Sequence, residues 1–173
     1  MHYYRTLYIL IVAEVRLPGS ARVTVFLGQR GRPSGVFRIL LAEDNPGDVL
    51  LFQEAIKGRD LPCEVVVAED GPRALAILST SAGPTLDLIV LDVNLPKLNG
   101  DAVLRELRGR DSLAHIPVMM LTSSSSPASK ASALALGAKL YIEKSSDLEE
   151  LFEVGKVVEG ILRGNQDARP ATT

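Results

Sequence analysis

Residues 39–48 read ILLAEDNPGD and combine the signals of a strand, a turn and a helix start. The stretch opens with an apolar run without alternation, as expected of a strand buried on both faces of a parallel sheet. Asn45-Pro46 then supplies a helix N-cap followed by proline at the first helical position. Two acids, Glu43 and Asp44, lie between the apolar run and this cap. The stretch therefore predicts a β-α unit with two carboxylates at the carboxyl end of its strand.

The same pattern recurs along the chain from residue 36 to residue 163. Short apolar runs rich in Val, Ile and Leu predict strands at residues 37–41, 64–68, 86–91, 117–121 and 139–142. Helical patterns begin at Asn45-Pro46, Gly71-Pro72, Gly100, Pro127 and the capping-box sequence of residues 146–149. Such a succession of β-α units predicts a doubly wound α/β sheet with right-handed crossovers.

Charged and hydroxyl side chains follow the predicted strands, at the edge where open α/β sheets bind their ligands. They are Glu43 and Asp44 after the first strand, Asp92 after the third, Thr122 after the fourth and Lys144 after the fifth. Taken singly, each is ordinary, because an acid after a strand is usually a turn former and a lysine is usually a solvated surface group. Their gathering at one edge of a sheet favours a common site.

The residue types at this edge point to phosphoryl chemistry. Three acids need a counter-charge, and oxygen ligands without thiolate or imidazole select a hard cation such as Mg²⁺. A bound cation would neutralise an incoming phosphoryl group and leave a carboxylate free to attack it. Lys144 would pair with phosphoryl oxygens, and the Thr122 hydroxyl would donate a hydrogen bond to another oxygen.

Three further motifs follow residues 39–48 along the chain: LIVLDVNLPKLNG at 88–100, PVMMLTSS at 117–124 and GAKLYIEK at 137–144. In their order and spacing, the four motifs together resemble a response-regulator receiver domain of the CheY-like type, over about residues 36–163. The resemblance implies a flavodoxin-like (βα)5 sandwich with a parallel five-stranded sheet of order 2-1-3-4-5. The loop sequences also resemble stand-alone regulators that serve cyanobacterial and bacterial phytochrome kinases.

The resemblance implies roles for the acidic residues. Asp92 matches the aspartate that accepts a phosphoryl group from a histidine kinase. Glu43 and Asp44 match the acidic pair that helps to hold Mg²⁺, with Asp44 favoured as the direct ligand. Asp92 and the backbone carbonyl of Asn94 would complete the metal shell.

Thr122 and Lys144 match the switch hydroxyl and the phosphate-binding lysine of receivers, and Tyr141 matches the aromatic switch residue. One departure concerns the residue after the lysine, which is commonly proline joined by a cis peptide but here is Ser145. A non-proline cis bond costs about 3 kcal/mol, so we expect a trans peptide. The motif match then fixes the placement of Lys144 and of the last helix less firmly, and switching is expected to be altered more than phosphoryl transfer.

The expected function is that of a single-domain response regulator of a two-component phosphorelay, cytoplasmic and not an enzyme beyond Mg²⁺-dependent self-phosphorylation. Its phosphodonor would be a sensor histidine kinase, of phytochrome type by the loop resemblance, or a phosphotransfer protein. Phosphorylation would change protein contacts, of which a homodimer is one. Because about ten polar residues follow the last helix and no basic patch or helix-turn-helix is present, we expect no nucleic-acid or membrane partner.

Two alternatives from other classes stay open. A pseudo-receiver would bind partners without being phosphorylated; the intact acidic and basic set argues against it, while Ser145 keeps it in play. An aspartyl-nucleophile phosphohydrolase would typically carry a second aspartate two residues after the first, where this chain has Asn94.

Composition and charge separate the N-terminal residues from the rest. The chain has 173 residues, 46% apolar and 23% charged, with a net charge of −2, which allows one domain of ordinary size. Its one cysteine, Cys63, excludes an internal disulfide framework and suits a reducing compartment. Residues 1–35 carry +4 and the remainder −6.

Residues 1–35 form an N-terminal extension with three open interpretations. They are a non-native segment translated from too far upstream, a flexible extension that forms a hairpin of residues 7–15 and 22–27, or an export signal, which Glu14 and the missing cleavage site disfavour. The receiver domain is expected at 36–163, followed by a disordered tail at 164–173.

Overall fold

The computed structural model describes residues 12–16, 22–26, 35–59, 61–80, 85–123, 126–145 and 147–167. The chain divides into two compact units, residues 1–34 and 35–173. In the first unit, β1 (Val12–Arg16) pairs with β2 (Arg22–Phe26) in an antiparallel register. This pairing agrees with the hairpin interpretation, although residues 7–11 of the proposed strand lie outside the described residues.

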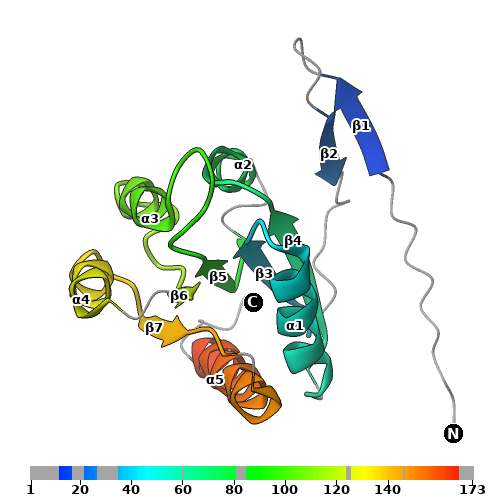
Figure 1. The fold of residues 1–173 in the computed structure, drawn as a ribbon. Helices are drawn as coiled ribbons and strands as arrows, with labels where there is room; N and C mark the ends of the chain where they lie inside the picture. The colour runs from blue at the N-terminus through cyan, green and yellow to red at the C-terminus, as the bar shows by residue number, and fades with distance from the viewer. Residues whose placement is uncertain are drawn as a thin grey trace, which may run out of the picture. The chain divides into compact units, whose positions relative to one another are not determined.

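The second unit is built on a five-stranded parallel sheet (Figure 1). Its strands are β3 (Phe37–Ala42), β4 (Cys63–Ala68), β5 (Leu88–Leu91), β6 (Val118–Thr122) and β7 (Leu140–Glu143). They lie in the order β4-β3-β5-β6-β7, and every neighbouring pair is parallel. The predicted order 2-1-3-4-5 is therefore confirmed, and β5 is buried along its whole length, as its LIVL sequence predicts.

Five helices connect and flank these strands. They are α1 (Pro46–Lys57), α2 (Gly71–Leu78), α3 (Gly100–Arg108), α4 (Pro127–Ala135) and α5 (Leu148–Asp167). The N-caps of α1 to α4 are Asn45, Asp70, Asn99 and Ser126, each of which accepts a hydrogen bond from a backbone N–H in the first turn. Short polar side chains before each helix thus supply the partners that its first N–H groups lack.

The helices cover both faces of the sheet, α1 and α5 on one face and α2, α3 and α4 on the other (Figure 1). Each face has its own apolar core. Ile39, Phe52 and Val158 belong to the core under α1 and α5, whereas Leu40 and Leu104 belong to the core on the opposite face. Because successive residues of β3 enter opposite cores, both helix layers pack against the same sheet.

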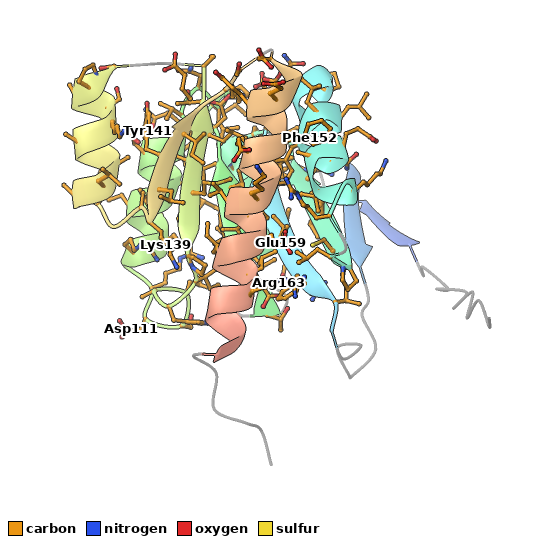
Figure 2. All side chains as sticks on the ribbon, turned by 90° about the horizontal axis from the view of Figure 1, so that it is seen from below. Asp111, Lys139, Tyr141, Phe152, Glu159 and Arg163 are labelled. Atoms are coloured by element: carbon orange, nitrogen blue, oxygen red, sulfur yellow. The ribbon has the colours of Figure 1, made fainter. Side chains whose placement is uncertain are left out.

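The last helix is longer than predicted. Helix α5 runs to Asp167, four residues beyond the predicted end at Arg163, and Figure 2 labels Phe152, Glu159 and Arg163 along it. Of the predicted capping box, Ser146 lies outside the described residues, while Asp147 Oδ1 accepts a hydrogen bond from the N–H of Glu149 at 2.8 Å. Among the described residues, no helix is long and apolar enough to cross a membrane.

Candidate functional site

The predicted site residues meet at the carboxyl edge of the sheet because backbone hydrogen bonds extend its ladders past the strand ends. The N–H of Glu43 donates to the carbonyl of Ala68 at 2.9 Å, and the N–H of Asp92 donates to that of Ala42 at 3.0 Å. The N–H of Lys144 donates in the same way to the carbonyl of Thr122 at 2.7 Å. These bonds fix the backbone of three site residues to the sheet itself.

The acidic residues form a cluster at this edge. Carboxylate oxygens of Glu43, Asp44 and Asp92 lie within 4.8 Å of one another. Glu43 and Asp92 are buried, and Asp44 is exposed. Backbone N–H groups also support the cluster, since that of Asn45 donates to Glu43 Oε1 at 3.1 Å and that of Asn94 donates to Asp92 Oδ1 at 2.9 Å.

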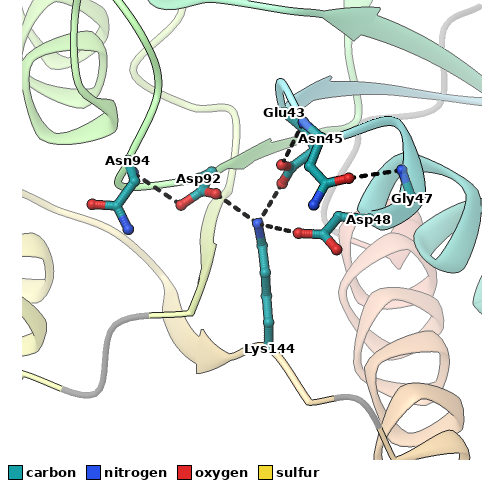
Figure 3. Close-up of polar contacts among 7 residues, drawn as sticks. All are labelled: Glu43, Asn45, Gly47, Asp48, Asp92, Asn94 and Lys144. Carbon is teal, nitrogen blue, oxygen red and sulfur yellow. Dashed lines mark hydrogen bonds and ion pairs between the residues drawn. The ribbon is translucent and has the colours of Figure 1, made fainter.

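The ammonium of Lys144 bridges three carboxylates at the centre of the site (Figure 3). Its Nζ lies 2.6 Å from Glu43 Oε2, 2.6 Å from Asp92 Oδ2 and 2.9 Å from Asp48 Oδ2. Burial by itself lowers the pKa of this lysine, but the hydrogen bonds to Asp92, Glu43 and Asp48 outweigh burial and raise the pKa above its ordinary value. Lys144 is therefore a fixed positive charge at neutral pH.

Burial has the opposite consequence for one of its partners. It raises the pKa of Glu43 above its ordinary value, and the hydrogen bonds from Lys144 and from the N–H of Asn45 only partly offset this effect. A buried carboxylate of this kind needs a nearby cation to stay ionised. Lys144 supplies one positive charge to an edge that carries four acids, counting Asp44 and Asp48.

The donor set fits a hard divalent cation. Only carboxylate oxygens belong to the cluster of Glu43, Asp44 and Asp92, and such ligands suit Mg²⁺ or Mn²⁺ better than a thiophilic metal. The excess of acids over Lys144 also leaves negative charge that a cation would neutralise. The part predicted for the Asn94 carbonyl stays a prediction, since its described contact is the N–H bond to Asp92.

Thr122 and Tyr141, the predicted switch residues, lie on β6 and β7, the two strands that precede Lys144. Thr122 ends β6 and is fully buried, and its carbonyl holds the backbone of Lys144. Tyr141 lies on β7, three residues before Lys144, and packs against the core on the α2–α4 face. The Lys144–Ser145 peptide is trans, as predicted, and the ammonium of Lys144 reaches the carboxylates with serine at position 145.

Asp48 belongs to the site although it was not among the site residues predicted from the sequence. Asp48 lies in the first turn of α1, where an acid is ordinarily explained by the helix dipole. Asp44 precedes the N-cap Asn45 and lies outside the helix, so no helical spacing linked Asp48 to the acids after the strand. The first turn of α1 follows the strand end directly, and there the Asp48 carboxylate meets Lys144 (Figure 3).

A close backbone contact positions the aspartate after β5. Helix α3 begins at Gly100, where a Cβ atom would lie 2.1 Å from the carbonyl oxygen of Asp92. The N–H of Gly100 also donates to the carbonyl of Val93 at 3.0 Å. Only glycine lets the start of α3 approach this closely.

Comparisons with known proteins agree with this geometry. Residues 39–156 match the model of the response regulator receiver domain. The response regulator Rcp1 of Synechocystis is 37% identical over 127 residues, covering 71% of this chain and 84% of Rcp1. The regulatory protein PhoP of Bacillus subtilis is 35% identical over 135 residues, and the match spans 78% of this chain but 52% of PhoP.

Solved structures give the same result. The phosphorylated cyanobacterial phytochrome response regulator RcpA is 36% identical with a TM-score of 0.68, covering 75% of this chain and 95% of RcpA. The Mn²⁺-bound form of Rcp1 is 34% identical with a TM-score of 0.65, covering 72% of this chain and 92% of Rcp1. The chain therefore belongs to the response regulator receiver domain family.

Proposed function

We propose that this response regulator accepts a phosphoryl group on Asp92. A carboxylate oxygen of Asp92 attacks phosphorus in a phosphohistidine, the P–N bond breaks, and the imidazole leaves with the bonding electron pair. The product is an acyl phosphate on Asp92 and a free histidine on the donor. Transfer changes the charge at one point of the site and biases two pre-existing conformations of the protein.

One observation carries this proposal: the Asp92 carboxylate is buried and lies within 2.6 Å of a lysine ammonium. A carboxylate held in a fixed place beside a cation can attack phosphorus, while the same cation offsets the charge that the phosphoryl oxygens bring. In this proposal Thr122 and Tyr141 are the switch residues, and Lys144 binds the phosphoryl oxygens.

Glu43, Asp44, Asp92 and the Asn94 carbonyl are the residues proposed to hold Mg²⁺, which when bound would offset the charge of the transferring group. The assignment of Glu43 and Asp44 is supported by the cluster that their carboxylates form with Asp92. The Mn²⁺-bound structure of Rcp1 supports a divalent cation in the family but not this choice of ion.

The proposed donor is a sensor histidine kinase, and similarity to Rcp1 and RcpA favours a phytochrome-type kinase. A phosphotransfer protein is the second donor class. We further propose that the protein acts in the cytoplasm through protein contacts, a homodimer included, and without binding nucleic acid or a membrane surface. The residues from 36 onward carry −6, which disfavours both of those polyanionic partners.

The decisive experiment uses small phosphodonors, which need no kinase. Acetyl phosphate with Mg²⁺ should add one phosphoryl group by intact-protein mass spectrometry, and Asp92→Asn should abolish the addition. Asp111→Asn is the matched control, because Asp111 is exposed in the segment before β6, at the other edge of the sheet (Figure 2). A wild-type protein that gains no mass with either acetyl phosphate or a phosphorylated kinase would favour the pseudo-receiver.

A further inference from the structure

Two of the three carboxylates that hold Lys144 belong to the cluster proposed to bind a cation. Glu43 and Asp92 each contact the ammonium at 2.6 Å, and both lie in the cluster with Asp44. A divalent cation and the ammonium would therefore compete for the same two carboxylates. When the cation binds, Lys144 loses part of its pairing with both residues.

Asp48 is placed differently from these two acids. It contacts the same ammonium at 2.9 Å but comes from the first turn of α1, outside the carboxylate cluster. Its side chain is 32% exposed, against 3% and 6% for Glu43 and Asp92, so water contacts Asp48 more than it contacts the other two acids. Asp48 can keep the ammonium after a cation has taken the other two carboxylates.

The space around the pair allows such a movement. Asp48 and Lys144 both line a cavity of about 220 Å³, together with Phe52, Leu121 and Ser145. The lysine side chain has four methylene groups and keeps several rotamers open. Its ammonium can therefore shift toward Asp48 while the backbone stays bonded to Thr122.

We propose that Asp48 is a positioning residue that retains the Lys144 ammonium at the site when a divalent cation takes over the oxygens of Glu43 and Asp92. This inference rests on the cation site of the proposed function. Without Asp48, the cation would displace an ammonium for which the described residues offer no further carboxylate within ion-pair distance. Asp48 therefore lowers the free-energy cost of replacing the Lys144 ammonium by a divalent cation at Glu43 and Asp92.

The first test measures Mn²⁺ binding by the electron paramagnetic resonance of the free ion, on the full chain. Asp48→Asn should weaken Mn²⁺ binding about three- to tenfold, the range for losing a partly exposed charged hydrogen bond. In a Lys144→Gln background the same change should have less than about a twofold effect, since there is no ammonium to retain. Asp48→Glu should restore most of the wild-type affinity.

The matched control is Glu150→Gln, because Glu150 lies in the first turn of α5 and lines the same cavity. It removes one negative charge without a described contact to Lys144, so it should leave Mn²⁺ affinity within about twofold of wild type. An equal loss of affinity from Asp48→Asn with and without Lys144 would mean that Asp48 acts only as a distant charge, and the proposal would be overturned. So would an unchanged affinity in Asp48→Asn.

A second test needs no metal and no phosphorylation. In EDTA, a double-mutant cycle on urea unfolding should show that Asp48→Asn costs more stability when Lys144 is present than it does in the Lys144→Gln background. No coupling in this cycle would also overturn the proposal. If coupling is found but Asp92 takes no phosphoryl group, the positioning role stands and the proposed phosphorelay function fails.

Discussion

Gly100→Ala tests whether the close approach of α3 holds Asp92 in place. The added Cβ would lie 2.1 Å from the carbonyl oxygen of Asp92 and 3.0 Å from its carbonyl carbon. Ordinary contact begins near 3.4 Å, so the two backbones must separate by at least about 1.3 Å. Both colliding atoms are backbone atoms, and Asp92 is tied to Ala42 by its N–H, so no side-chain rotation relieves the clash.

The expected cost is at the upper end of the range for overpacking a core, about 3 kcal/mol. For a domain of this size that corresponds to a fall in Tm on the order of 10 °C. Urea unfolding followed by far-UV circular dichroism measures the loss directly. The same substitution should slow phosphorylation by acetyl phosphate, because the carboxylate moves with its backbone.

Gly160→Ala is the matched control in α5, because a Cβ there meets nothing within 4 Å. Alanine in an open helical position should stabilise the protein by up to about 1 kcal/mol. A free energy of unfolding for Gly100→Ala within about 0.5 kcal/mol of wild type, a change ordinary for surface sites, would contradict a close contact between α3 and Asp92. An equal loss of stability in both alanine variants would contradict it as well.

The remaining predictions concern packing, pH and thiol chemistry. Gly155→Ala should cost about 2–3 kcal/mol in urea unfolding, because its Cβ would lie 2.3 Å from the carbonyl oxygen of Ala55 and would push α5 off α1. A hydrogen bond from Lys97 lowers the pKa of Asp70, so the pair stabilises the fold above the ordinary carboxylate pKa and stops doing so as pH falls through the lowered value. Asp70→Asn should therefore lower stability by up to about 1 kcal/mol near pH 6 and make no difference near pH 2, as judged from urea midpoints. Burial raises the pKa of Cys63 to about 11, so its reaction with a disulfide reagent at about pH 8 should be at least about tenfold slower than that of a free cysteine, and equal rates would contradict this.

The sheet could be predicted from sequence because its signal is dense and local. Runs such as LIVL at β5 are apolar at every position. Burial on both faces of a parallel sheet explains such a run, because neither face then needs polar side chains. Helix starts were predictable where a polar cap and a proline coincide, as at Asn45-Pro46. The end of α5 was not, because Gly164 reads as a stop although the helix continues to Asp167.

Some features of the site could likewise be predicted from the sequence, and others could not. Glu43, Asp92 and Lys144 could be placed together because parallel strands bring their carboxyl ends to one edge. The contact between Lys144 and Asp48 could not, since a lysine side chain reaches in several directions and an acid in a first helical turn already has an explanation in the helix dipole. Nor did the sequence indicate that Gly100 must accommodate the carbonyl of Asp92, because glycine at the start of a helix has several ordinary causes.

The way the site is tied to the sheet limits what can move when its charge changes. Glu43, Asp92 and Lys144 each donate a backbone hydrogen bond that extends a strand ladder, and Gly100 closes against the carbonyl of Asp92. A phosphoryl group on Asp92 would thus add charge at a fixed point. The ammonium of Lys144 can move, because its side chain is long and it has carboxylate partners on three different segments. A shift of the Lys144 ammonium from one carboxylate to another therefore lets the site respond to a new charge without moving its backbone. The positions of the carboxylates determine where the ammonium goes.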